Sequence, residues 1–345
     1  MGNMNEVLYM EKMENLLEIK YEQISTRFDA EQGVLWTFMN PKGVPCVNLR
    51  MLDDLFHHYK GLENSAGEVF VGNAFHPIKY VIFASKFPEI FNLGGDLVMF
   101  NKLIQKRDRK TFLHYATRCI DVMTSMITHY NNLPVTTISL IQGDALGGGF
   151  EAALASDIII AERGSKMGFP EILFNLFPGM GAYSILARKL GTIQAERMLL
   201  NGKMYSAQEM HELGLVDVLA EDGEGEATVL EYVQRQKRRA NGFQAIQRAR
   251  QRANPITRQE LLDITTIWVD AVLRLDESDL KMMNRLARSQ QKLYGLGETP
   301  ELSEPVIETS RFGNITPLNI SQLVRQKPSA DVVLPMRERR MAMAA

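Results

Sequence analysis

Four short runs of β-branched and aromatic residues stand out in the first half of the chain. They are bounded by residues that favour turns or break helices, and they cover 33–39, 79–85, 135–141 and 157–162. Runs of this kind predict buried strands. Helical patterns also occur, a long one over 97–130 and shorter ones over 49–60, 182–190 and 206–213. Strands that alternate with helices predict an α/β domain.

The pattern becomes purely helical from about residue 226 to residue 296. Apolar residues there recur at helical spacing, among them Leu261, Ile264, Ile267, Trp268, Val272, Leu275, Leu280, Met283, Leu286 and Leu293. We therefore expect an α/β core over 1–225 and an all-α region over 226–296. Prolines and little apolar periodicity beyond Gly297 predict an extended or disordered tail over 297–345.

Composition narrows the possible partners. The chain has 345 residues, of which 45% are hydrophobic and 23% charged, as in ordinary globular proteins. Its formal charge is -2, which gives no overall attraction to nucleic acid or an anionic membrane. We see no apolar run of the ~18 residues that a membrane span needs and no export signal, so we expect a cytoplasmic protein. The histidines show no metal-ligand spacing, so no metal site is predicted.

Three consecutive glycines, Gly147, Gly148 and Gly149, follow one predicted strand and precede a helical segment. Glycines at such a corner allow positive φ and let the backbone approach a ligand closely. Their N–H groups lie at a helix N-terminus, where negative charge is favoured. The segment therefore outlines an anion or oxyanion site. The alternative is a tight turn with close helix packing.

A second glycine corner and two glutamates strengthen the catalytic interpretation. Gly94 and Gly95 lie between another strand and helix, so a second amide could point at the same oxygen and complete an oxyanion hole. Glu151 and Glu171 lie among apolar residues, which should raise their pKa values and suit them to acid and base roles. A single glutamate in a helix, by contrast, is usually solvated or paired.

Together these segments resemble the crotonase (enoyl-CoA hydratase/isomerase) superfamily. The resemblance rests on residues 91–97, 143–151, 169–171, 178–181 and 205–217. It implies an α/β fold with a crotonase-like spiral core of ββα units, and a homotrimer in which region 226–296 supplies pocket and trimer contacts. By the same resemblance, Gly95 and Gly148 supply the oxyanion amides. Glu151 and Glu171 occupy the positions of the two catalytic glutamates.

The amino-acid sequences of segments 91–97, 145–154 and 176–184 resemble one branch of this superfamily, the diffusible-signal-factor synthases of quorum sensing. That resemblance implies dehydration of a 3-hydroxyacyl chain on acyl carrier protein, followed by thioester hydrolysis that releases a cis-2-unsaturated fatty acid. No cofactor is implied beyond acyl carrier protein or CoA as thioester carrier, and a regulatory sensor kinase is a possible partner. The alternatives are an ordinary enoyl-CoA hydratase and a catalytically idle crotonase-fold binding protein.

The resemblance also suggests a substrate pocket and a docking face. The expected pocket residues are Gly94, Leu146, Gly147, Met180, Trp268 and Leu286, although Trp268 and Leu286 could equally be plain helical core. A basic stretch that contains Arg235, Lys237, Arg238 and Arg239 could dock an acidic acyl carrier protein or meet the phosphates of CoA. The alternative for this stretch is a solvated helix face.

Overall fold

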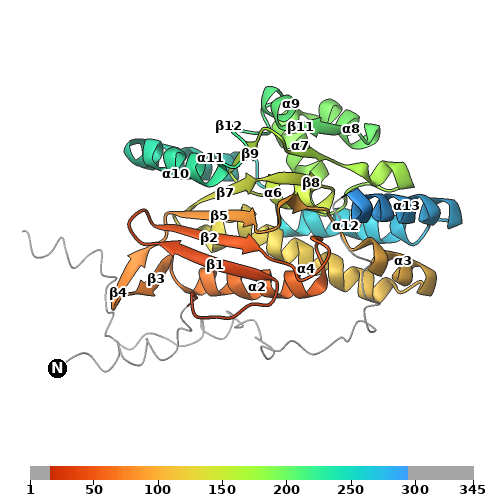
Figure 1. The fold of residues 1–345 in the computed structure, drawn as a ribbon, viewed down its shortest axis with the longest axis horizontal. Coiled ribbons are helices and arrows are strands. Elements are labelled where there is room, and N and C mark those ends of the chain that lie inside the picture. The colour runs from red at the N-terminus through yellow and green to blue at the C-terminus, as the bar shows by residue number, and fades with distance from the viewer. Residues whose placement is uncertain (1–15, 294–345) are drawn as a thin grey trace, which may run out of the picture. The chain divides into compact units, whose positions relative to one another are not determined.

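The computed structural model describes residues 16–293, whose largest element is a six-stranded sheet (Figure 1). The strands are, in order across the sheet, β1 (Ile24–Asp29), β2 (Val34–Met39), β5 (Tyr80–Ser85), β7 (Thr136–Ile141), β9 (Ile158–Glu162) and β12 (Val218–Ala220). Only the β1–β2 pair is antiparallel. The four strands predicted from apolar runs are confirmed as its centre, and every residue of β2, β5, β7 and β9 is buried.

A second sheet of four strands carries the shorter strands that the apolar pattern did not predict. Its order is β11 (Met204–Ser206), β10 (Lys166–Gly168), β8 (Gly143–Leu146) and β6 (Glu89–Asn92). The pairs β6–β8 and β8–β10 are parallel, and β10–β11 is antiparallel. A separate hairpin is formed by β3 (Glu68–Val71) and β4 (Ala74–Pro77).

The two sheets are connected by a repeated unit. The chain passes from a strand of the large sheet to a strand of the small sheet and then into a helix: β5, β6 and α3 (Leu97–Lys106), then β7, β8 and α6 (Gly148–Leu154), then β9, β10 and η1 (Pro170–Phe174). This repetition confirms the expected spiral of ββα units. Because β6 and β8 are adjacent and parallel, the corners that follow them lie side by side.

The remaining helices of the core surround these sheets, and one sequence prediction about them is wrong. They are α2 (Leu49–Asn64), α4 (Arg109–Ile127), α5 (His129–Asn132), α7 (Ala182–Leu190), α8 (Thr192–Asn201) and α9 (Ala207–Glu212). The long helix expected over 97–130 is broken, because Arg107 adopts the left-handed conformation with φ 50° and ends α3. The Asp108 side chain then accepts a hydrogen bond from the Thr111 amide and begins α4.

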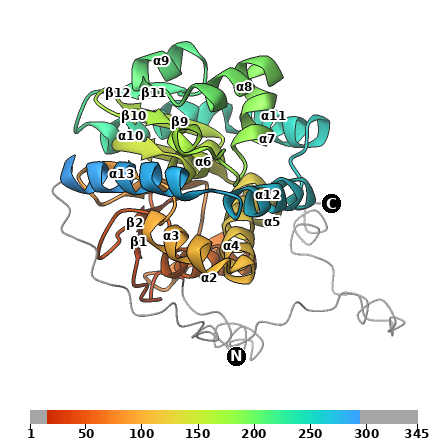
Figure 2. The ribbon, with the colours of Figure 1, turned by 90° about the vertical axis from the view of Figure 1, so that its right-hand side faces the viewer.

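The C-terminal part of the described chain is helical, as predicted. It contains α10 (Gly225–Gln236), η2 (Lys237–Arg239), α11 (Ala240–Ala253), α12 (Arg258–Val272) and α13 (Glu277–Leu293). Figure 2 shows α13 running across the view just above α3, with which it is in contact. None of the described helices is long and apolar enough to cross a membrane. The predicted tail over 297–345 lies outside the described residues.

Candidate active site

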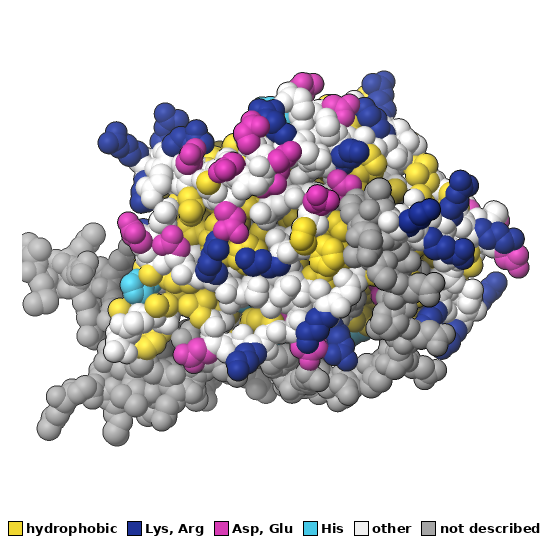
Figure 3. All heavy atoms as spheres, in the orientation of Figure 1, with side chains coloured by type: hydrophobic (Ala, Val, Ile, Leu, Met, Phe, Trp, Pro, Cys, Tyr) yellow, Lys and Arg dark blue, Asp and Glu magenta, His cyan; other side chains and the backbone are white. Residues whose placement is uncertain are grey.

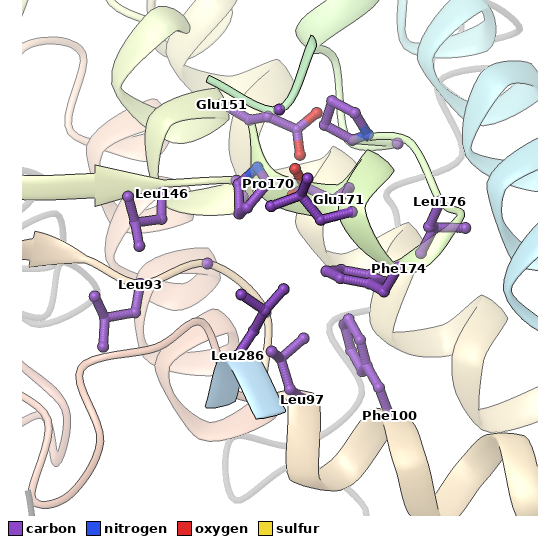
Figure 4. Close-up of a pocket in the computed structure, with 18 of the residues that line it drawn as sticks. Leu93, Leu97, Phe100, Leu146, Glu151, Pro170, Glu171, Phe174, Leu176 and Leu286 are labelled. Carbon is purple, nitrogen blue, oxygen red and sulfur yellow. The ribbon is translucent and has the colours of Figure 1, made fainter. Parts of the chain in front are cut away.

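A cavity of about 340 Å³ lies where α3, η1, α12 and α13 meet the two glycine corners. All six residues predicted for the substrate pocket line it: Gly94, Leu146, Gly147, Met180, Trp268 and Leu286. Figure 4 shows side chains from α3, η1 and α13 converging around this space. Most of the lining is apolar, and Glu151 and Glu171 are among its few ionisable side chains.

The two glycine corners face one another across one end of the cavity. Gly94 has φ 89° and Gly147 has φ 48°, conformations that residues with a Cβ rarely adopt. A Cβ placed on Gly148 would lie 3.7 Å from the nitrogen of Gly95. The backbone amides of Gly95 and Gly148 are therefore close together. Within the described chain, neither the Gly95 amide nor the Gly148 amide donates a hydrogen bond to another residue. Both donors therefore remain available to a ligand oxygen.

The Glu151 carboxyl group accepts hydrogen bonds from backbone amides at the start of α7 and just before it. Its carboxyl Oε1 accepts hydrogen bonds from the amides of Met180 at 2.8 Å and Ala182 at 2.9 Å. The second carboxyl oxygen of Glu151, Oε2, would lie 3.9 Å from a Cβ placed on Gly148. This oxygen therefore faces the glycine corners. Burial raises the pKa of Glu151 to about 7, against the lowering effect of the backbone donors. The carboxyl group therefore titrates near neutral pH.

Glu171 approaches the same space from η1. Its Oε2 is buried and has no hydrogen-bond partner among residues 16–293, although most buried carboxyl oxygens have one. Burial raises the pKa of Glu171 to about 8, and the negative charge of Glu151 adds to the effect. Figure 4 shows the carboxyl groups of Glu151 and Glu171 pointing toward one another. Because two nearby carboxylates resist ionising together, the pair retains a proton near neutral pH.

An aromatic cluster, of which the sequence singled out only Trp268, lines the cavity near the glycine corners. The ring centroids of Phe100 and Trp268 lie 5.5 Å apart, and those of Phe100 and Tyr115 lie 5.3 Å apart. The Tyr115 hydroxyl donates a hydrogen bond of 2.9 Å to the carbonyl of Val47, whose amide donates to the carbonyl of Gly94 at 2.7 Å. Tyr115 thereby supports the backbone that presents the Gly95 amide.

The predicted carrier-docking residues are not part of this site. Arg235 ends α10, and Lys237, Arg238 and Arg239 form η2, where all four are exposed. None of them lines the cavity. Figure 1 places α10 and α11 at the opposite end of the described body from α3 and α13. The structure therefore separates the basic stretch from the cavity, and its docking role rests on charge alone.

The buried Glu171 carboxyl predicts a pH-dependent stability difference. Its folded pKa of about 8 lies above its ordinary value of 4.5, so its contribution to stability is fully present below about pH 4.5 and is lost as pH rises through about 8. Glu171→Gln removes this titration. We expect its Tm, relative to the wild type, to increase from about pH 5 to about pH 9. A constant Tm difference in thermal unfolding across this range would contradict the raised pKa.

Comparison with known proteins agrees with the geometry. The profile of the family described as "Enoyl-CoA hydratase/isomerase" matches residues 31–252. The chain belongs to the enoyl-CoA hydratase/isomerase family. The chain is 34% identical to the mitochondrial methylglutaconyl-CoA hydratase of the mouse over 151 residues. The aligned part covers 44% of this chain and 46% of that protein. The chain thus spans less than half the length of this curated relative.

Solved structures of this family share the fold. An enoyl-CoA hydratase from Bacillus halodurans superposes with a TM-score of 0.65 at 20% identity, covering 76% of this chain and all of that one. The human mitochondrial delta3-delta2-enoyl-CoA isomerase gives a TM-score of 0.63 at 19% identity, covering 79% of this chain and 99% of its own. At these identities the likeness supports the α/β crotonase fold alone.

Proposed function

We propose that this enoyl-CoA hydratase/isomerase family member dehydrates a 3-hydroxyacyl thioester and then hydrolyses the thioester, releasing a cis-2-unsaturated fatty acid signal. The observation that carries the proposal is the pair of carboxyl groups, Glu151 and Glu171, with pKa values raised to about 7 and about 8 beside two free amides. Elimination of water needs one group that accepts a proton and one that donates a proton. The pair provides both at neutral pH.

In the first step the thioester oxygen lies between the amides of Gly95 and Gly148. One carboxylate removes a proton from C2, and the resulting enolate oxygen is stabilised by the two N–H donors. The other carboxyl group donates its proton to the C3 hydroxyl, which leaves as water while the double bond forms. One proton is taken up and one is given back, so the pair ends with the same total charge.

The second step reuses the same groups. A carboxylate of the pair accepts a proton from water, whose oxygen attacks the thioester carbonyl. The tetrahedral oxyanion occupies the site between the Gly95 and Gly148 amides, and its collapse breaks the C–S bond. The carrier thiolate takes that proton back from the carboxyl group and leaves as the thiol, so the pair is restored and the free acid remains. The support for this step is the sequence resemblance of segments 91–97, 145–154 and 176–184 to diffusible-signal-factor synthases.

An ordinary enoyl-CoA hydratase is the second candidate, and the methylglutaconyl-CoA hydratase similarity favours it. The same pair and the same amides would add water to an enoyl-CoA. The two functions differ in the carrier and in the release of free acid. In either case we propose acyl carrier protein or CoA as the thioester carrier and a homotrimeric assembly.

The shared chemistry is tested by following the purified chain with 2-enoyl-CoA and with 3-hydroxyacyl carrier protein. We expect interconversion of the 3-hydroxy and 2-unsaturated thioesters, detected as a change in absorbance of the conjugated thioester. If neither substrate reacts, the catalytic proposal is wrong, and the idle binding protein becomes the better interpretation.

A further inference from the structure

The helix that closes the cavity has two chemically different faces. On one side of α13, Leu286 and Ser289 line the cavity, and Met283 is fully buried. After Asp279 the helix carries no acidic residue, but it carries four basic ones: Lys281, Arg285, Arg288 and Lys292. A wall of the cavity is therefore continuous with a strongly cationic exterior.

The four cations share one face of the helix. Their spacing of four, three and four residues places them within an arc of about 60°. Ser289 lies next to this arc, one turn from both Arg285 and Lys292, so the cationic face borders the side of α13 that lines the cavity. We call the four residues Lys281, Arg285, Arg288 and Lys292 the α13 basic face.

These cations are available to a partner. All four are exposed, and in the described chain Arg285, Arg288 and Lys292 form no ion pair. Among the residues that the structure places, Lys281 pairs only with the exposed carboxylate of Glu277, at a long distance of 3.8 Å. Figure 3 shows Lys and Arg side chains gathered at the right-hand end of the view, where Figure 1 places α13.

We propose that the α13 basic face docks an acidic acyl carrier protein while its acyl arm enters the adjacent cavity. This inference rests on the proposed function, because it needs a cavity that accepts an acyl thioester. The basic face runs from Lys281 to Lys292, eleven residue steps that correspond to about 16 Å along the helix. Such a length suits a row of carboxylates on a protein surface better than the compact phosphates of one CoA molecule. Charge complementarity at this face fixes the carrier at the cavity.

The test compares two triple variants with the same change in charge. Arg285→Glu, Arg288→Glu and Lys292→Glu reverse the α13 basic face, and Lys237→Glu, Arg238→Glu and Arg239→Glu reverse the basic stretch remote from the cavity. All six side chains are exposed, so both variants should fold. The measurements are the Kd for the unacylated carrier protein, the KM for 3-hydroxyacyl carrier protein, and the turnover of a short soluble thioester.

The α13 variant is expected to weaken carrier binding and raise the KM about tenfold at low salt, and less at high salt. The variant at 237–239 should behave as the wild type, and both should turn over the short thioester normally. Unchanged carrier binding in the α13 variant, or an equal loss for CoA thioesters, would overturn the docking inference. A wild-type protein that turns over no thioester would instead contradict the proposed function.

Discussion

Glu151→Gln and Glu171→Gln are each expected to lower kcat for dehydration by about 10²-fold or more. Each substitution keeps the size and shape of the side chain and removes its ability to gain or lose a proton. In the Glu151→Gln variant the side-chain carbonyl oxygen would still accept the hydrogen bonds from the Met180 and Ala182 amides, so the local backbone should remain in place. Steady-state turnover of 3-hydroxyacyl thioesters measures the effect.

A matched control is available in Glu162, which is also buried but does not line the cavity. Its carboxyl oxygen accepts a hydrogen bond from the Gly225 amide, which a glutamine can also do. Glu162→Gln should leave turnover near the wild-type value, and circular dichroism should show all three variants folded. Near-normal turnover in either site variant would remove that glutamate from the mechanism.

Gly148→Pro is expected to lower kcat by about 10²- to 10³-fold, because it deletes one of the two oxyanion donors. Gly148 is the first residue of α6, a position where proline is well tolerated because its missing N–H has no partner within the helix. Loss of activity with an intact fold would therefore report on the amide itself. The measurement combines turnover with the Tm.

Gly148→Ala is the control for this prediction. Apart from its chain neighbours and the backbone of α6 itself, its Cβ would meet no atom of residues 16–293 closer than 3.7 Å, and the amide is kept. The alanine variant should lose far less activity than the proline variant. A folded proline variant with full turnover would show that the Gly148 amide does not stabilise the transition state.

The sequence predicted the parts of the fold that depend on continuous apolar runs. Strands β2, β5, β7 and β9 are buried on both faces, and such strands leave a clear pattern. The short strands β6, β8 and β10 have three or four residues each and lie beside the glycine corners, so too few side chains reveal them. The break between α3 and α4 depends on one left-handed residue, Arg107, which no apolar period marks.

The sequence predicted the site residues that local sequence patterns reveal. It did not predict the contacts between segments that are far apart in the chain. Glycine corners and glutamates in apolar surroundings are visible along the chain, and the predicted pocket residues line one cavity. The support of Glu151 by Met180 and Ala182, and of the first corner by Tyr115 through Val47, joins segments far apart in sequence. The docking role predicted for the basic stretch at 235–239 stays a prediction, and its distance from the cavity could not be predicted, because charge density says nothing about distance from a site.

Product analysis in water enriched in oxygen-18 tests the proposed function most directly. The purified chain is incubated with 3-hydroxyacyl carrier protein, and the products are separated into free acids and thioesters for mass spectrometry. Dehydration followed by hydrolysis predicts a free cis-2-unsaturated acid with one heavy oxygen in its carboxyl group. Unsaturated or hydroxylated chains that remain entirely on the carrier, with no labelled free acid, would contradict the account and leave an ordinary hydratase.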